Sequence, residues 1–194
     1  MNGKFLDLVV RARTYRRFDE GVPIPETSLR TWVDCARLSP SAQNRQPLRY
    51  VIVSGKQKCN RVFPTLKWAA ALPEWAGPAQ GERPCAYLII CSKDANALTP
   101  IDVGIAAQSI KLAAQDDGFG SCMFKSFQKE QLARAIDLDT QEYAIELVIA
   151  FGVPAERVVV EPLSFDAENF DYWRDGEGVH HVPKYLLDDV IIAD

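Results

Sequence analysis

Two nearly continuous apolar runs limit the folds open to this 194-residue chain more than any other feature. The runs are CAYLIIC at 85–91 and AIELVIAFG at 144–152, and both are rich in residues that favour strands. A strand with one face in water alternates apolar and polar residues, and these runs do not, which predicts central strands covered on both faces. The segment LRYVIVSG at 48–55 predicts a third strand that ends at Gly55.

Two helices are predicted before the 48–55 strand, and a third is predicted after the 85–91 strand. Apolar residues recur at helical spacing in 5–12 and in 29–36. A third helix is predicted to open with a capping box of Thr99 and Asp102, with a proline at its first position, and to stop by Gly118. Its middle is rich in Gly, Ala and Ser, so another helix could approach closely, inside the core or across a subunit interface. The residues alone favour the core.

Composition excludes several classes of protein. Lys and Arg number 22 against 26 Asp and Glu, a net charge of −4, so general attraction to nucleic acid or to a membrane is not expected. The sequence shows neither a signal peptide nor a membrane span, which predicts a cytoplasmic protein. Five cysteines without a C-x-x-C pair predict no disulfide framework and no metal site. The adjacent His180 and His181 are interpreted as surface or structural residues.

Residues 64–84 form the longest segment without a regular period. They hold four of the 12 prolines together with Trp68 and Trp75, which predicts a long surface loop of the kind that serves as a lid or binding loop. We find no internal repeat and no interdomain linker. The chain is therefore expected to be a single domain over residues 1–194.

The segment RARTYRRF concentrates four arginines within seven residues, namely Arg11, Arg13, Arg16 and Arg17. Like charges so close repel one another unless an anion lies among them, and guanidinium groups with the Thr14 hydroxyl match phosphate oxygens. The alternative is a solvated basic helix end, favoured by the helix dipole. A nucleic-acid site is less favoured, because no basic stripe extends the cluster.

A second polar segment, SPSAQNRQP at 39–47, joins a helix to a strand. Its hydroxyl and amide groups are typical of sites for polyols and heterocycles, although the same residues also fill ordinary turns. Common catalytic motifs are absent from the sequence: there is no G-x-S-x-G, no H-E-x-x-H and no P-loop. The glycines at 118 and 120 follow a predicted helix and not a strand, so they do not support a Rossmann site.

Four segments in order resemble the FMN-dependent nitroreductase family. They are R-T-Y-R-R-F at 13–18, S-P-S-x-x-N-x-Q-P at 39–47, the helix with its G-F-G-S-C ending at 102–123, and ELVIAFGVP at 146–154. The segment 172–184 is similar to a branch of small nitroreductase-like proteins. The resemblance implies an α+β fold with a mainly antiparallel central sheet flanked by helices, and an intertwined homodimer with FMN at the interface. It also implies that the predicted helix at 99–118, with its small side chains, packs across the dimer interface.

The resemblance implies a set of FMN-binding residues. Arg13 and Thr14 should hold the phosphate and ribityl chain, and Arg16 the phosphate or the N1/O2 edge of the flavin. The residues expected around the rest of the cofactor are Pro40, Ser41 and Asn44 from the partner subunit, the backbone near Phe124, Lys125 and Ser126, and Lys184 at the phosphate. No dedicated catalytic acid is implied.

Three positions differ from the family pattern. Ala12 stands where many relatives have a phosphate-binding arginine, and Tyr185 stands where a second basic residue is frequent. Lys125 replaces a common glycine, and a side chain pointing inward there would narrow the space over the flavin.

The resemblance implies a ping-pong reaction, in which NADH or NADPH reduces the flavin and leaves before an electron-poor acceptor takes the electrons. Nitroaromatic, quinone and enone-like acceptors are all open. Two other hypotheses remain: a relative with different flavin chemistry, such as dehalogenation or flavin consumption, and an FMN-binding or redox-sensing dimer with little turnover.

Overall fold

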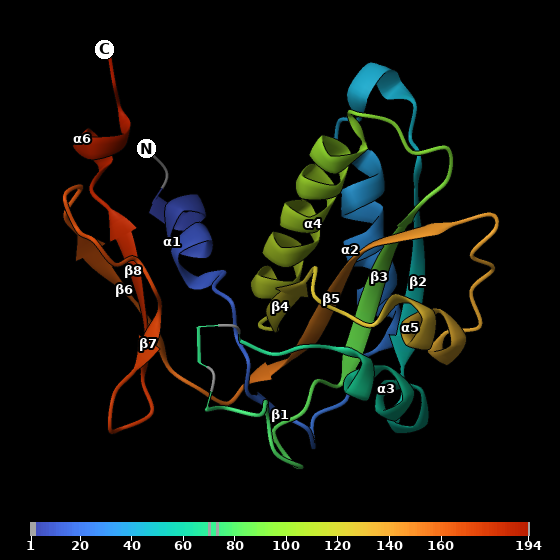
Figure 1. Cartoon of the computed structure of the whole chain (residues 1–194), viewed down its shortest axis with the longest axis horizontal. Helices are drawn as coiled ribbons and strands as arrows, with labels where there is room; N and C mark the ends of the chain where they lie inside the picture. The colour runs from blue at the N-terminus through green and yellow to red at the C-terminus, as the bar shows by residue number, and fades with distance from the viewer. Residues whose placement is uncertain (1–2, 70, 73, 194) are drawn as a thin grey trace.

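The computed structural model describes residues 3–69, 71–72 and 74–193, and Figure 1 shows helices and strands mixed along them. The helices are α1 (Gly3–Arg11), α2 (Glu26–Leu38), α3 (Lys56–Val62), α4 (Thr99–Asp116), α5 (Lys129–Ala135) and α6 (Leu187–Val190), with 3-10 turns η1 (Ala42–Asn44) and η2 (Phe63–Thr65). The strands are β1 (Phe18–Asp19), β2 (Leu48–Ser54), β3 (Ala86–Ser92), β4 (Gly120–Phe124), β5 (Ala144–Pro154), β6 (Val158–Leu163), β7 (Trp173–Arg174) and β8 (His180–Tyr185). Within these ranges, no helix is long and apolar enough to cross a membrane.

The main sheet has the order β1-β5-β3-β2, and β4 also pairs with β5. All of its pairs are antiparallel, which confirms the expected mainly antiparallel sheet and the α+β class. The two apolar runs of the sequence form β3 and β5, which are neighbours at the centre. The predicted strand at 48–55 forms β2, one edge of the sheet.

Both faces of β3 are buried, which explains why its sequence does not alternate. Leu88 and Ile90 face one core, which also holds Leu29 and Trp32 of α2 and Ile110 of α4. The alternating side chains Tyr87 and Ile89 face a second core, which also holds Val62 of α3 and Leu132 of α5. The sheet is therefore the middle layer between two pairs of helices.

The two N-terminal helices and α4 occur where the sequence predicts them, but the predicted capping box is wrong. The hydroxyl of Thr99 accepts the backbone N–H of Asn96 at 2.9 Å. The carboxylate of Asp102 accepts the Ser41 hydroxyl at 3.0 Å and the Ala42 N–H at 2.8 Å, so it binds the 41–42 turn instead of capping its own helix. The helix ends at Asp116 as expected.

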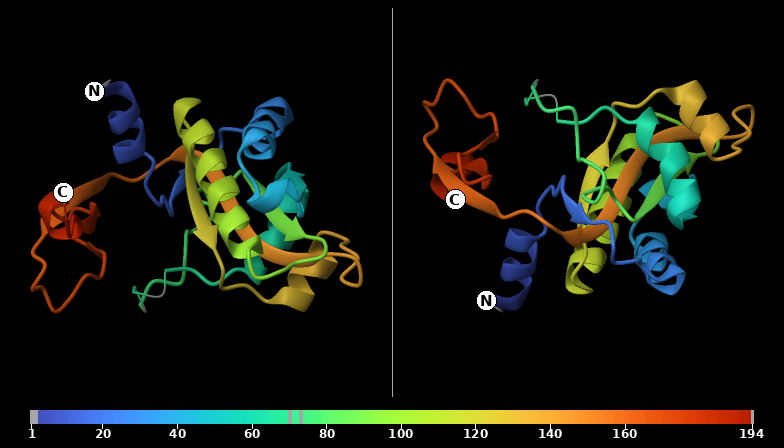
Figure 2. Two further views of the ribbon diagram at one scale, coloured as in Figure 1. Left: turned by 90° about the horizontal axis from the view of Figure 1, so that it is seen from above. Right: turned by 90° about the horizontal axis from the view of Figure 1, so that it is seen from below.

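Residues 155–193, which we call the C-terminal arm, stand away from the main sheet (Figures 1 and 2). In the arm β6 pairs with β8 in parallel and β7 pairs with β8 antiparallel. This second sheet was not predicted, because its strands are short and two of them carry prolines. The arm must therefore be stabilised by specific polar contacts more than by a core of its own.

His181 joins the three strands of the arm. Its imidazole Nδ1 contacts the carboxylate of Glu161 on β6, and its Nε2 lies 3.1 Å from Asp175 Oδ2, just after β7. The Trp173 ring stacks on the imidazole, with 4.0 Å between the ring centroids and 8° between the planes. The hydrogen bonds to Asp175 and Glu161 raise the pKa of His181, and the bond to His181 lowers the pKa of Asp175.

These shifts predict a stability that depends on pH. The raised pKa of His181 contributes stability that is complete below its unfolded value of 6.5, and the lowered pKa of Asp175 contributes stability that is complete above 3.8. We expect His181→Gln to destabilise the protein more at about pH 5.5 than at about pH 8.5, because the wild-type ion pair is lost as pH rises through the His181 pKa. Urea unfolding at both pH values measures this, and an equal loss at both would contradict it.

Candidate functional site

The arginine segment, residues 11–17, runs beside β4. Thr14 forms a parallel bridge with Ser121, and the backbone N–H of Tyr15 donates to the Ser121 carbonyl at 3.0 Å. A Cβ on Gly120 would lie 2.6 Å from the Tyr15 ring, so glycine is required for this close approach. Gly120 thereby allows the arginine segment to lie against the first residues of β4.

A cavity of about 390 Å³ brings together three of the predicted site residues, Arg16, Lys125 and Ser126. Aromatic side chains from three separate segments line it as well, namely Trp68, Phe124 and Tyr172. Thr14 joins the arginine segment to the strand that forms one wall. Most ligand pockets combine apolar walls with a few fixed polar groups, and this cavity has that character.

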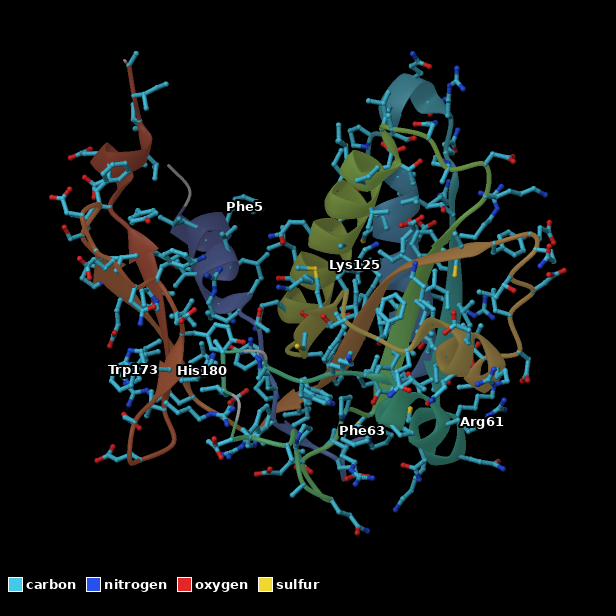
Figure 3. All side chains as sticks on the ribbon, in the orientation of Figure 1. Phe5, Arg61, Phe63, Lys125, Trp173 and His180 are labelled. Atoms are coloured by element: carbon cyan, nitrogen blue, oxygen red, sulfur yellow. The ribbon has the colours of Figure 1, made fainter. Side chains whose placement is uncertain are left out.

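Arg16 is held in place from the arm. Its guanidinium is buried, with Nη1 2.9 Å from His180 Nε2 and its central carbon 4.2 Å from the centre of the Tyr172 ring. Burial and the charge of Arg16 lower the pKa of His180 to about 4, so the imidazole is neutral and Nε2 accepts from Arg16. Trp173 and His180 lie on opposite sides of the arm (Figure 3). His180 is therefore buried and not a surface residue, and its contact with Arg16 positions that guanidinium.

Glu156 connects the arginine segment to the arm. Its carboxylate accepts the backbone N–H of Arg16 and, at 3.1 Å, that of Arg17. Its other oxygen accepts Arg174 Nη2 at 2.8 Å, and the Glu156 side chain is only 1% exposed. The negative charge of Glu156 is therefore matched by Arg174 and by two backbone groups.

Four cations in or near the arginine segment have no carboxylate partner among the described residues. Among the residues that the structure describes, no carboxylate oxygen lies within 4.0 Å of the cationic nitrogens of Arg13, Arg16, Lys111 or Lys184. Burial and the charges of the other three lower the pKa of Lys111. Arg13 donates to the Val9 carbonyl, but its buried Nε has no acceptor within the described ranges. A group of cations with free donors fits a phosphate.

Pro40, Ser41 and Asn44 lie elsewhere. Pro40 and Ser41 line a second cavity of about 410 Å³ between α2, β2 and α4. Their turn lies at the N-terminal end of α4, whereas β4 begins just after its C-terminal end (Figure 1). A single chain therefore does not bring these three residues to Arg16.

Lys125 does not extend its ammonium over the cavity. Its Nζ donates to the carbonyl oxygen of Glu146 at 2.6 Å and lies 3.3 Å from Glu146 Oε2, so it is held on β5. Lys125 is nevertheless one of the residues that line the cavity.

Part of the 64–84 loop lies against the cavity, which Lys67, Trp68 and Ala69 line. The backbone N–H of Lys67 donates to the Ser126 carbonyl at 3.0 Å. The Trp68 ring then packs edge-on against Phe124, with 4.7 Å between the ring centroids. Trp75 continues the contact to the arm, because Arg174 lies 4.5 Å above its ring. Residues 70 and 73 of the loop lie outside the described residues.

Sequence reasoning missed Lys111 and Tyr172. Lys111 is the one charged residue between Asp102 and Asp116 in α4, a position that would have identified it as an unusual side chain on a buried helix. Tyr172 begins the 172–184 segment that carries the family resemblance, but nothing in its spacing indicates a contact with Arg16. That contact depends on how the arm folds back.

Comparisons with known proteins agree on one family. The model of the nitroreductase family matches residues 9–153. A protein from Bacteroides thetaiotaomicron described as an NADH dehydrogenase/NAD(P)H nitroreductase is 21% identical, with a TM-score of 0.66 over 87% of this chain and 95% of its own. An FMN-dependent nitroreductase from Clostridium difficile is 18% identical, with a TM-score of 0.63 over 78% and 88%. Comparison with curated protein sequences found no match.

The contacts of Glu156 predict a large cost for Glu156→Gln. The substitution leaves the Arg174 charge buried without an anion, and such a loss costs about 3–5 kcal/mol of unfolding free energy. Glu82→Gln is the matched control, because Glu82 is 38% exposed and lies 3.7 Å from Arg17, and it should cost less than about 1 kcal/mol. Denaturant unfolding of both variants measures the difference, and equal small losses would contradict the assigned role of Glu156.

Proposed function

The chain belongs to the nitroreductase family, and from this membership we propose that it is an FMN-dependent oxidoreductase that passes electrons from NADH or NADPH to a small electron-poor acceptor. The observation that carries the proposal is the buried guanidinium of Arg16, which lines an aromatic cavity and has no carboxylate partner among the described residues. Arg13, Lys111 and Lys184 are further cations of the same kind, and Arg13, Arg16 and Lys184 all act on Lys111. Two structural relatives, one described as FMN-dependent and one as an NAD(P)H nitroreductase, support the choice of cofactor and donor.

The residues present fit FMN in two parts. Arg13, Thr14 and Lys184 would hold the phosphate and ribityl chain, since the buried Nε of Arg13 has no acceptor among the described residues. Arg16, Ser126 and the stem of Lys125 would lie along the ring system, because they line the cavity. When bound, FMN supplies the capacity to accept a hydride from NAD(P)H and to give two electrons to the acceptor.

The chain's own contribution to the reaction is position and charge. Arg16 is fixed by His180 and Tyr172, so its positive charge is oriented before any ligand arrives. Negative charge that develops on a bound ring system would be stabilised by that guanidinium without reorganisation of the protein. The buried thiol of Cys122 has a pKa raised to about 12 by burial, so it stays protonated and supplies no nucleophile.

Two copies of the chain complete the site in this proposal. Pro40, Ser41 and Asn44 are remote from Arg16 in one chain, and a partner subunit would supply them. The surface agrees with a second copy, because α1 exposes Phe5 and Leu6 at 62% and 63%. Further exposed apolar side chains lie in the arm and include Phe165, Phe170, Leu187, Val190 and Ile191.

The remaining expectations are part of the same proposal. Trp68 would limit the size of acceptors, which include nitroaromatic, quinone and enone-like compounds, because it forms a wall of the cavity. The chain would act as one domain over residues 1–194. Its five cysteines are free thiols, which fits a reducing compartment such as the cytoplasm. An FMN dimer with a sensing role, or with dehalogenating or flavin-consuming chemistry, is the alternative that a lack of turnover would favour.

The proposal predicts a yellow homodimer with one FMN per subunit. Its visible absorption should bleach when NADH or NADPH is added without oxygen and return when an acceptor such as a quinone is added. Absorption spectroscopy and light scattering measure these properties. A colourless monomer that takes up no FMN would overturn the proposal, and a yellow dimer that neither nucleotide bleaches would favour the sensing role.

Arg13 and Arg17 form a matched pair for testing the phosphate site. Arg13→Ala removes a charge-assisted contact worth about 1.5–3 kcal/mol, which weakens FMN binding about tenfold to two-hundredfold. Arg17→Ala should weaken it little, because Arg17 faces Glu82 and Trp75. FMN titrations of both apoproteins measure the two dissociation constants. Equal losses would mean that the cluster acts only as diffuse charge.

A further inference from the structure

Lys111 is a buried lysine with no partner of opposite charge. It lies in α4, is 6% exposed, and has neither a carboxylate nor a hydrogen-bond acceptor in contact with its ammonium among the described residues. Its helix neighbours Ala107, Ile110 and Ala114 are buried and apolar. A lysine in such a place loses part of its hydration, which is unfavourable unless another group replaces the water.

The part of the chain that the structure describes does not supply that group. The charges that act on Lys111 from the arginine segment and from β8 are the positive charges of Arg13, Arg16 and Lys184. Glu156 is the carboxylate that binds the backbone of the arginine segment, and it is already paired with Arg174. Cys122, the other ionisable side chain facing Lys111, remains a neutral thiol. An anion from outside the chain is therefore the group that would compensate four neighbouring positive charges.

Ala12, next to Arg13, is an uncharged residue among these cations. It is buried at the start of the arginine segment, and it replaces the phosphate-binding arginine expected from the family resemblance. α4 packs against both α1 and β4, the two elements that flank the arginine segment, so a long side chain from α4 can reach that segment.

We propose that Lys111 is a ligand of the FMN phosphate and supplies, from α4, the positive charge that Ala12 does not. The inference rests on the proposed function, since it assumes that FMN is the ligand. It adds one residue to the phosphate site, which then consists of Arg13, Thr14, Lys184 and Lys111. A lysine fits this task because its stem can cross the apolar surface of α4 while its ammonium reaches the ligand.

Comparing FMN with riboflavin tests the proposal, because the two flavins differ only by the phosphate. Lys111→Met keeps the length of the side chain and removes the charge. We expect it to raise the dissociation constant of FMN about tenfold or more and to leave that of riboflavin unchanged. Lys58→Met, which removes an exposed lysine of α3, is the control and should change neither constant. Lys111→Arg should keep most of the FMN affinity.

Thermal unfolding of the apoproteins gives a readout without FMN. Wild-type apoprotein should be stabilised by added inorganic phosphate. Lys111→Met should unfold at a higher temperature than the wild type without phosphate, because a repelling buried charge is gone, and should gain less from phosphate.

The outcomes separate this proposal from the proposed function. A wild-type protein that binds no FMN would overturn both. FMN binding by the wild type and equal binding by Lys111→Met would overturn only the role of Lys111. An equal loss of FMN and riboflavin would place Lys111 at the ring system or in the fold, and it would overturn the assignment to the phosphate.

Discussion

The buried carboxylate of Glu156 is the interaction on which the candidate site depends. It lies at the point where the chain leaves β5 for the arm, and it accepts hydrogen bonds from the arginine segment on one side and from Arg174 on the other. Because Arg174 also contacts Trp75, the same carboxylate indirectly places the 64–84 loop. Three segments distant in sequence are thus held around one cavity by one negative charge.

The same arrangement determines the charge of the site. Glu156 binds Arg16 through the backbone N–H, not through the guanidinium, so the Arg16 side chain remains available. That guanidinium contacts a neutral histidine and an aromatic ring, which fix its position without cancelling its charge. A carboxylate there would have stabilised the unliganded protein and competed with any anionic ligand. The polar contacts are therefore arranged to orient cations and to leave them free.

The sequence predicts the parts of the fold whose residues repeat at one period. The runs at 85–91 and 144–152 and the helices around Trp32 and Ile110 were predictable because each buries a whole face or both faces. β4 was not predicted, since a five-residue strand beginning with the glycine that Tyr15 requires has no strand pattern of its own. Asp102 was misread as a cap because its true partners, Ser41 and Ala42, are about 60 residues distant in sequence.

The residues of the candidate site also fall into those that the sequence reveals and those that only the fold reveals. The arginine cluster could be found from the local sequence, since four like charges in an acidic chain are unusual in any fold, and the family resemblance then selected Arg13 and Arg16 from it. His180 could not, because a histidine pair is an ordinary feature until the fold shows one of its members to be buried beside an arginine. Lys111 carried a local signal as a lone charge in an apolar helix, but only the fold shows that it lies near arginines.

Like charges gathered without counterions lower the stability of the unliganded protein, and the cost falls when an anion binds. If the proposed phosphate site is correct, the stability of the unliganded chain and its affinity for the ligand are therefore opposed at the same four residues: each further carboxylate near Arg13 or Lys111 would favour the empty protein at the expense of the complex. The placement of Glu156, close enough to bind the backbone of Arg16 but engaged by Arg174, satisfies both requirements. It allows the arm to fold onto the arginine segment without a carboxylate on the Arg16 guanidinium.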